Sequence, residues 1–358
     1  MTSIDETNGQ RTPTRRIHVE APYFEDLKAG QLFRDAPAVT LTSGHTAFHE
    51  ALFGDRLRLP LDATLCEAVT GSSSLLVHPN VVCNIAIGQS TSMTQRVRGN
   101  LFYRGLILHR PVFVGDTLRT STEVVALRQN HVKAGRNATG MAVLQIHVEN
   151  QRGNTVLHFW RCAMLPCRDP KADTGADDSF DAIPAQLEMG QINAAVPSDW
   201  RLDAYRHELP GEHFADLAAG TEYLVEAGDT VTSAPELARL TLNVAKAHTD
   251  AASSPYARRL VYGGHTISMA AAQIVRALPN LVTLLAWRSC DHKEPVFEGD
   301  VLRTEFSIDA LHPLERGGGL VDLHAIVHAK RGDQAPDPVP SSGIDVAVLD
   351  WRVVGLMA

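Results

Sequence analysis

The chain has 358 residues, which is too many for one small domain and favours two or three compact units. Hydrophobic residues make up 44% and charged residues 21%, as in ordinary globular proteins, and no apolar run approaches the roughly 20 residues of a membrane span. The net charge of -8 opposes nucleic acid over the whole surface, although it is compatible with a local basic pocket. We therefore expect a soluble protein without a nucleic-acid or membrane partner.

The N-terminal end of the chain is expected to form a tail. Residues 1–20 are polar and lack the apolar centre of a secretory signal, which favours a loose segment in a cytoplasmic protein. The five cysteines are scattered and form no CxxC pair, so we expect reduced thiols and no metal site. The sequence also has no Rossmann glycine fingerprint, P-loop or GxSxG elbow, so no nucleotide cofactor is expected.

The sequence contains an internal repeat. Pro111–Thr120 reads PVFVGDTLRT and Pro295–Thr304 reads PVFEGDVLRT, with eight of ten positions identical. Asp116 and Asp300, in the repeated Gly-Asp pairs, are expected to organise β-turns through side-chain to backbone hydrogen bonds. Shorter landmarks recur in the same order, and the offsets of 184 to 191 residues across all these segments indicate two copies of one domain. These are FEDLKAG with FADLAAG, TLTS with TVTS, and VLHFWR with VLDWR.

The elements follow the same order along both copies. Each copy opens with FxDLxxG and a short strand whose Thr or Ser can cap a helix, and then has a longer helical stretch, residues 72–88 or 263–279. Alternating or β-branched runs fill the remainder, which predicts antiparallel strands. A long helix followed by several strands predicts an α+β domain in which the sheet wraps the helix. In the first copy these runs are residues 101–114, 118–130, 140–151 and 156–165.

A segment rich in Asp, Ala, Pro and Gly joins the two copies. Residues 167–200 show no sustained apolar period and are predicted to form a linker. The predicted organisation is therefore a flexible tail over residues 1–20, a first domain over 21–166, the linker over 167–200, and a second domain over 201–358.

The polar residues best placed for chemistry fall in the second copy. Asn243 precedes His248 by five residues, and the two side chains can share a site if the chain leaves the helix between them. Gly263 and Gly264 then open an apolar helix, where free backbone N–H groups can bind a developing oxyanion. Each residue also has a structural interpretation, because Asn caps helices and a Gly pair suits a tight turn.

This combination resembles the MaoC-like, (R)-specific enoyl-CoA hydratases, whose pattern has an Asp five residues before a His-x-Asp and then a VHGM-like helix start. PVFVGDTL is similar to the same family, and the two-copy length, RLVYGGHTISMA and the Trp-Arg pairs resemble its two-domain branch, which includes mesaconyl-CoA hydratases. The resemblance extends from about residue 22 to the C-terminus and implies a double hotdog fold. It also implies an acyl-CoA thioester as substrate, no cofactor beyond the CoA of that substrate, and a homodimer as an option.

Matched position by position, the resemblance assigns roles to single residues. His248 matches the catalytic histidine, Asn243 stands where most members have the catalytic aspartate, and Gly263 matches the glycine whose N–H faces the thioester oxygen. A carboxamide does not titrate near neutral pH, so His248 would move the proton alone. In the first copy Asp55 fits the start of the motif but Pro60 replaces the histidine, so that copy is expected to form a wall of the pocket.

Neighbouring residues receive weaker assignments. Asp250 is a candidate supplementary carboxylate, and Gly264 and Tyr262 are candidate substrate-binding residues, with Tyr262 in the family's usual histidine position. Arg258 and Arg259 could pair with the phosphates of CoA, although solvated surface charge is the simpler account of both.

The leading functional hypothesis is an enzyme that reversibly hydrates an enoyl-CoA, or equally dehydrates a 3-hydroxyacyl-CoA. One alternative is an acyl-CoA binding protein that lost its activity with the aspartate. Another is a hotdog thioesterase, which needs a carboxylate to activate water against the carbonyl.

Overall fold

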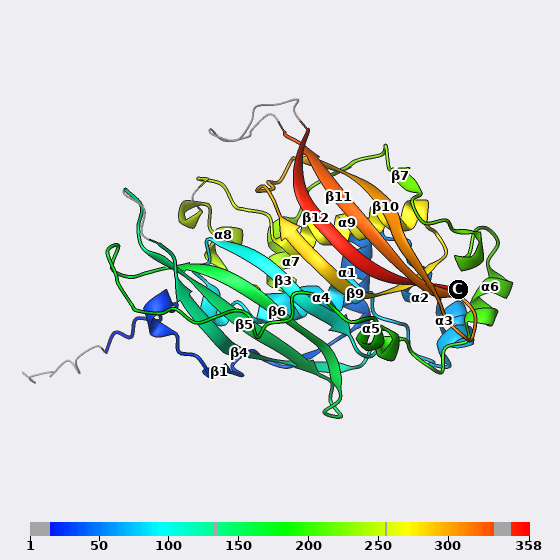
Figure 1. Ribbon diagram of the computed structural model, residues 1–358, viewed down its shortest axis with the longest axis horizontal. Helices are drawn as coiled ribbons and strands as arrows, with labels where there is room; N and C mark the ends of the chain where they lie inside the picture. The colour runs from blue at the N-terminus through cyan, green and yellow to red at the C-terminus, as the bar shows by residue number, and fades with distance from the viewer. Residues whose placement is uncertain (1–14, 132–134, 255, 333–344) are drawn as a thin grey trace, which may run out of the picture.

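A single antiparallel sheet runs through both copies of the repeat in the computed structural model (Figure 1). The structure describes residues 15–131, 135–254, 256–332 and 345–358, so most of the predicted tail lies outside the described residues. Within them the sheet has 12 strands, in the order β1-β4-β5-β6-β3-β9-β12-β11-β10-β7, with β2 on β4 and β8 on β10. The first copy contributes β1 (Leu32–Phe33), β2 (Val39–Thr40), β3 (Gly99–Leu108), β4 (Thr117–Gln129), β5 (Thr139–Glu149) and β6 (Thr155–Pro166). The second contributes β7 (Glu222–Leu224), β8 (Asp229–Thr230), β9 (Leu281–His292), β10 (Val301–Pro313), β11 (Gly319–Lys330) and β12 (Asp345–Met357).

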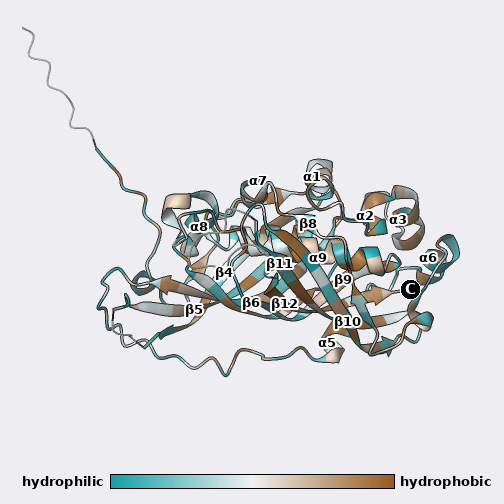
Figure 2. Ribbon diagram, turned by 90° about the horizontal axis from the view of Figure 1, so that it is seen from above, coloured by the Kyte–Doolittle hydropathy of each residue, from teal (hydrophilic) through white to brown (hydrophobic). Residues whose placement is uncertain are grey.

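Most helices gather on one face of this sheet, while α5 lies on the other (Figure 2). The central helix of each copy is the one predicted to be long, and in α9 every residue from Gly264 to Val275 is buried. A helix that is buried on all sides is the expected core of a sheet that wraps around it. The α+β prediction is thus confirmed in both copies. The α-helices are α1 (Ser43–Phe53), α2 (Arg58–Leu61), α3 (Ala63–Thr70), α4 (Pro79–Gln89), α5 (Met189–Ala195), α6 (Leu202–Glu208), α7 (Ala234–Leu240), α8 (Lys246–Thr249) and α9 (Gly263–Ala277).

The two copies meet along the β3–β9 strand pair and between the central helices. Leu106 of β3 lies opposite Trp287 of β9 in the antiparallel register. Between the helices, Asn84 Nδ2 of α4 donates to Ser268 Oγ of α9 at 3.0 Å. A Cβ at Gly264 would lie 2.0 Å from Asn84 Oδ1, so this helix contact requires glycine there. Gly264 therefore serves helix packing, and its predicted role in substrate binding stays a prediction.

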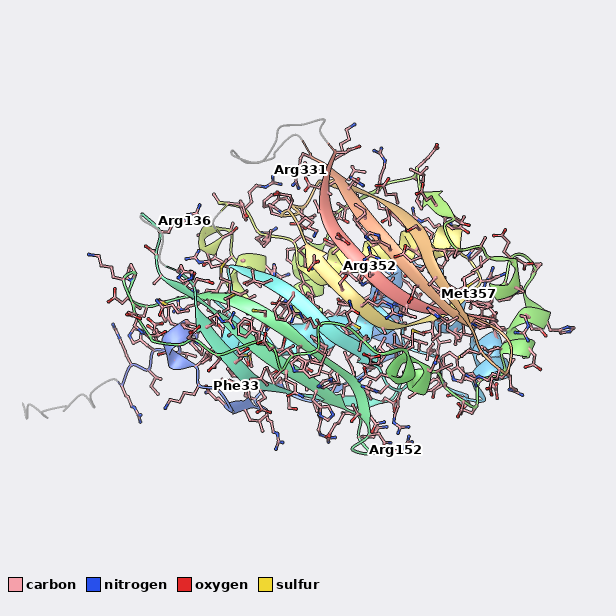
Figure 3. The ribbon with its side chains drawn as sticks, viewed as in Figure 1. Phe33, Arg136, Arg152, Arg331, Arg352 and Met357 are labelled. Carbon is pink, nitrogen blue, oxygen red and sulfur yellow. The ribbon has the colours of Figure 1, made fainter. Side chains whose placement is uncertain are left out.

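The repeated Gly-Asp pairs form equivalent turns, as predicted. Phe113 N–H donates to Asp116 Oδ2 at 2.9 Å, and Phe297 N–H donates to Asp300 Oδ2 at 3.0 Å. The second turn carries an additional buried ion pair, because Arg331 Nη1 lies 2.8 Å from Asp300 Oδ2. Arg331 is labelled in Figure 3 just beyond the end of β11. This ion pair fixes the turn that follows β9.

The segment between the copies packs against the body of the protein. Residues 167–200 contain α5, and Leu187, Ile192 and Trp200 in this segment are buried in an apolar cluster. The domain limits given above stay predictions. Within the described part of the chain, no helix combines the length and the apolar character needed to cross a bilayer.

Candidate active site

A cavity of about 1130 Å³ lies between the two copies and contains the strongest of the predicted site residues. The second copy contributes Asn243, His248, Tyr262 and Gly263 to its lining. The first copy contributes an opposite wall, in agreement with the expectation for that copy. The wall includes Ile87, Thr91, Asn100, Tyr103 and Arg161.

Asn243 and His248 reach the same cavity because the chain leaves the helix between them. Helix α7 ends at Leu240, Leu242 adopts a left-handed conformation with φ +58°, and α8 begins only at Lys246. The Asn243 side chain is occupied locally, since its Oδ1 accepts the N–H of Ala245 at 2.9 Å. Asn243 therefore shapes the entry to α8, and its amide cannot replace the proton-transferring carboxylate of an aspartate.

His248 has the protonation state of a general base. Its Nδ1 donates to the carbonyl oxygen of Leu260 at 2.8 Å, which assigns the ring proton to Nδ1 and leaves the lone pair on Nε2. Burial lowers the pKa of His248 from its ordinary value of 6.5, with the Leu260 carbonyl opposing in part. The imidazole is therefore neutral at pH 7, and Nε2 can accept a proton from water in the cavity.

The start of helix α9 presents the backbone amide of Gly263 to the same cavity. Its N-cap residue, Tyr262, makes no side-chain capping hydrogen bond, because the Tyr262 hydroxyl instead donates to the Asn84 carbonyl at 2.9 Å. Among the described residues, no acceptor pairs with the N–H of Gly263 or Gly264. These amides and the positive end of the helix dipole favour an anion at this position. Gly263 N–H, which lies at the cavity lining, can therefore stabilise an oxyanion.

The equivalent cavity of the first copy cannot perform this chemistry. It measures about 350 Å³ and is lined in part by Ala195, Pro197 and Trp200 from the segment between the copies. Helix α4 starts at Pro79 in the place of Gly263, and proline has no N–H to offer an oxyanion. With Pro60 in the place of His248, the first copy lacks both the base and the donor.

Three buried side chains of the first copy lie close enough to suggest a metal site. Ligand atoms of His49, Asp55 and His78 all lie within 4.8 Å of one another, and His78 Nε2 lies 3.0 Å from Asp55 Oδ2. His78 Nδ1 accepts the N–H of Asn80 at 3.0 Å, however, so its proton resides on Nε2. A metal-binding histidine needs the opposite arrangement, with a lone pair on the ligating nitrogen and a proton on the other. The cluster fits a buried carboxylate with hydrogen-bonding imidazoles better than a metal centre.

The charge of that cluster supports the same interpretation. Burial alone would raise the pKa of Asp55, but His78 and His49 outweigh it and hold the pKa well below its ordinary range. Burial and the neighbouring His78 lower the pKa of His49 to about 4. An ionised carboxylate beside two imidazoles is a stable arrangement without any added ion.

Asp250 and the two predicted arginines lie outside the cavity lining, so the structure does not bring them together with His248. Asp250 is exposed, and its oxygens accept from Ala252 N–H at 3.0 Å and Ser253 Oγ at 2.6 Å, so it caps a short 3-10 turn. Arg259 pairs with Glu298 at 2.9 Å, and Arg258 Nη2 donates to the Glu298 carbonyl at 3.0 Å. Local sequence distance suggested proximity to His248, but the chain turns away after α8.

A basic groove adjoins the cavity on another side. It measures about 970 Å³ and shares Val97, Arg98, Ala247 and Leu260 with the cavity lining. Its cationic side chains are Arg96, Arg98, Arg168 and Lys246. Arg168 is partly neutralised by Asp26 at 2.8 Å and Lys246 interacts electrostatically with Asp250, whereas no described acidic residue forms an ion pair with Arg98. This groove is the local basic pocket that the overall negative charge permitted.

Two further residues of the cavity were not predicted from the sequence. Arg161 of β6 is buried, and its Nε and Nη2 donate to Ser90 and Thr94. His292 is the last residue of β9, and a Cβ on Gly263 would lie 2.5 Å from its Nε2. No local motif marks either residue. The sequence marks them only by their position relative to the repeated segments. Arg161 belongs to one repeated Trp-Arg pair, and His292 stands three residues before the repeated PVFEGD.

Comparisons with known proteins agree with this architecture. No family model matches the chain. It is 28% identical over 319 residues to mesaconyl-CoA hydratase of Cereibacter sphaeroides, covering 87% of this chain and 90% of that protein. It is 29% identical over 291 residues to beta-methylmalyl-CoA dehydratase of Chloroflexus aurantiacus, covering 78% and 80% respectively.

Two solved structures match along almost their whole length. One is a conserved hypothetical protein of Mycobacterium tuberculosis with a double hotdog fold, 46% identical with a TM-score of 0.84, covering 96% of this chain and 100% of that one. The other, from Chloroflexus aurantiacus, is named for its MaoC dehydratase domain and is 25% identical with a TM-score of 0.77, covering 94% and 97%. The predicted double hotdog fold is therefore confirmed.

Proposed function

Because the chain belongs to the double-hotdog branch of the MaoC-like hydratases and dehydratases, we propose that it reversibly hydrates an enoyl-CoA thioester. The observation that carries this proposal is the shared cavity of His248 and Gly263, which combines a neutral imidazole base with an unpaired helix amide. These are the two groups that addition of water to a thioester-conjugated double bond requires.

One base is sufficient for the reaction, because it removes a proton from water and later returns that proton to the substrate. His248 Nε2 takes a proton from water as the water oxygen bonds to Cβ, and the π electrons move toward the thioester oxygen. The Gly263 N–H stabilises the negative charge on that oxygen, a contribution worth roughly 3 to 4 kcal/mol for one such donor elsewhere. The protonated His248 then returns its proton to Cα, which regenerates the base and yields the 3-hydroxyacyl thioester. Dehydration follows the same steps in reverse.

The basic groove supports CoA as the carrier of the acyl group. Its cations lie next to the cavity through the residues that line both, and Arg98 and Lys246 offer charge to phosphate oxygens. We therefore propose that the cations of this groove, in place of Arg258 and Arg259, bind the phosphates of CoA. We expect the KM for an acyl-CoA, but not kcat, to rise with ionic strength.

Arg161 supports an acyl group that carries a carboxylate. Its guanidinium is buried at the cavity, with three donor contacts to Ser90 and Thr94, and no described acidic residue pairs with it. A buried cation without a counter-ion is costly, and an anionic ligand removes that cost. A carboxylated enoyl thioester such as mesaconyl-CoA satisfies this requirement, whereas crotonyl-CoA does not.

Loss of the enoyl-thioester absorbance tests the proposal, with crotonyl-CoA and mesaconyl-CoA offered to the purified protein. We expect turnover with the native chain and loss of turnover with His248→Ala. His207→Ala, an exposed histidine on α6, is the matched control and should stay active. An inert native protein across a broad enoyl-CoA panel would refute the enzymatic assignment.

Asn243 favours a second candidate, an acyl-CoA binding protein without turnover, because its amide is engaged with Ala245 and cannot titrate. That candidate predicts saturable thioester binding with no turnover, and binding by His248→Ala that equals the native protein.

We also propose that the protein acts in the cytoplasm, without a cofactor beyond the CoA of its substrate, and as a homodimer. Size-exclusion chromatography with light scattering tests the homodimer.

A further inference from the structure

His292 faces the start of the helix that presents the free amides. It ends β9, and its Nε2 is buried without a hydrogen-bond partner among the described residues. A Cβ built on Gly263 would lie 2.5 Å from this Nε2 and 2.7 Å from Cε1. Since both Cα–Cβ bonds and the first N–H groups of a helix point toward its N-terminus, His292 Nε2 and Gly263 N–H approach the same region of the cavity.

The environment of His292 keeps its imidazole neutral. Burial, with His248 as a second cause, lowers its pKa to about 4. A neutral ring cannot supply an acidic proton at pH 7, but its N–H can donate a hydrogen bond to an oxygen that becomes negative.

The pairing of His292 with Gly263 is specific to the active copy. At the offset of 184 residues that relates the two PVF segments, His292 corresponds to Leu108 and Gly263 corresponds to Pro79. The first copy therefore lacks both N–H groups at the equivalent place.

We infer that His292 Nε2–H is a second hydrogen-bond donor to the thioester oxygen, acting beside the amide of Gly263. This inference rests on the proposed function and identifies a residue that completes its oxyanion site. His248 performs the proton transfers, and His292 stabilises the charge that develops during them.

Replacement of His292 tests this role through catalysis. His292→Leu, which copies the first domain, should lower kcat about 10² to 10³-fold with a smaller change in KM, as removal of an oxyanion donor does elsewhere. His292→Gln keeps an N–H donor of similar reach and should recover about tenfold of the loss. His109→Leu, directly after the equivalent strand β3, is the matched control and should keep native activity.

The pH profile separates a donor from an acid or base. If His292 only donates a hydrogen bond, the pH dependence of kcat/KM in His292→Gln keeps the limbs of the native profile. Loss of a limb in that variant would overturn the donor role, as would native activity in His292→Leu.

A spectroscopic measurement separates this inference from the proposed function. The absorbance of bound cinnamoyl-CoA moves to longer wavelength when hydrogen bonds polarise its thioester carbonyl, whether or not water adds. The native protein should show this shift, and His292→Leu should bind the probe with a smaller shift. A shift in a native protein without turnover would support the donor pair while the hydratase assignment fails. An equal shift in His292→Leu, or no binding of the probe, would overturn the inference.

Discussion

Replacement of Gly263 by proline isolates the contribution of one backbone N–H. Proline is well tolerated at the first position of a helix, and its preceding residue must be extended. Tyr262 already has φ -61° and ψ 129°, close to the φ -55° and ψ 132° of His78 before Pro79 in the first copy. The change should therefore leave the fold intact while it removes the oxyanion donor.

A second variant accounts for the added bulk. Any Cβ at position 263 would lie 2.5 Å from His292 Nε2, so the imidazole must retreat by about 0.9 Å to reach an ordinary contact of 3.4 Å. Gly263→Ala carries this steric cost and keeps the N–H. The comparison between the two variants therefore measures the N–H itself.

The expected result is a graded loss of activity at nearly constant stability. Gly263→Pro should have kcat/KM about 10² to 10³-fold below that of Gly263→Ala, equivalent to roughly 3 to 4 kcal/mol of transition-state stabilisation. Thermal unfolding should show similar midpoints for both variants. Pro79→Gly is the converse control in the first copy and should leave kcat unchanged. Equal kcat/KM in Gly263→Pro and Gly263→Ala would refute the assignment of this amide as the donor.

Four further predictions follow from the structure. Because burial lowers the pKa of His248, kcat/KM should stay high below pH 6.5 and fall only as that lowered pKa is crossed, which a pH-rate profile measures. Burial lowers the pKa of His49 and His265 to about 4. Between pH 6.5 and 4 the unfolded chain therefore binds more protons than the folded protein. The free energy of unfolding, measured with urea, should decrease as the pH falls through that window. Arg161→Met should lower kcat/KM for mesaconyl-CoA more than for crotonyl-CoA, and equal losses would contradict carboxylate recognition. Gly264→Ala should lower the midpoint of thermal unfolding, because its Cβ would lie 2.0 Å from Asn84 Oδ1. Gly44→Ala in α1 is the control and should not lower it, because the nearest contact of its Cβ would be 3.4 Å.

The duplicated fold was predictable because it depends on local patterns that occur twice. The PVF segments, the short Thr-Ser strand ends and the apolar helices each specify one element, and their common order specifies two copies of one domain. The turns at Asp116 and Asp300 were predictable for the same reason, since an aspartate three residues from its partner amide needs no tertiary information.

The active site was predictable only where its residues are close in sequence. Asn243, His248 and Gly263 fall within one stretch, and the structure brings all three to one cavity. Arg161 comes from β6 of the first copy, so only the pairing of the two copies places it there, whereas the fold of the second copy brings His292 of β9 to Gly263. The same dependence on tertiary structure applies to Asp250 and Arg259, which are near His248 in sequence but form surface contacts of their own.

The origin of the hydrogen at Cα tests the central claim most directly. When an enoyl-CoA is converted in D₂O, mass spectrometry of the product should show one non-exchanging deuterium at Cα and a hydroxyl group at Cβ. His248→Ala should form no such product, while His207→Ala forms it at the native rate. Equal deuterated product from His248→Ala, or release of free CoA in its place, would contradict the account.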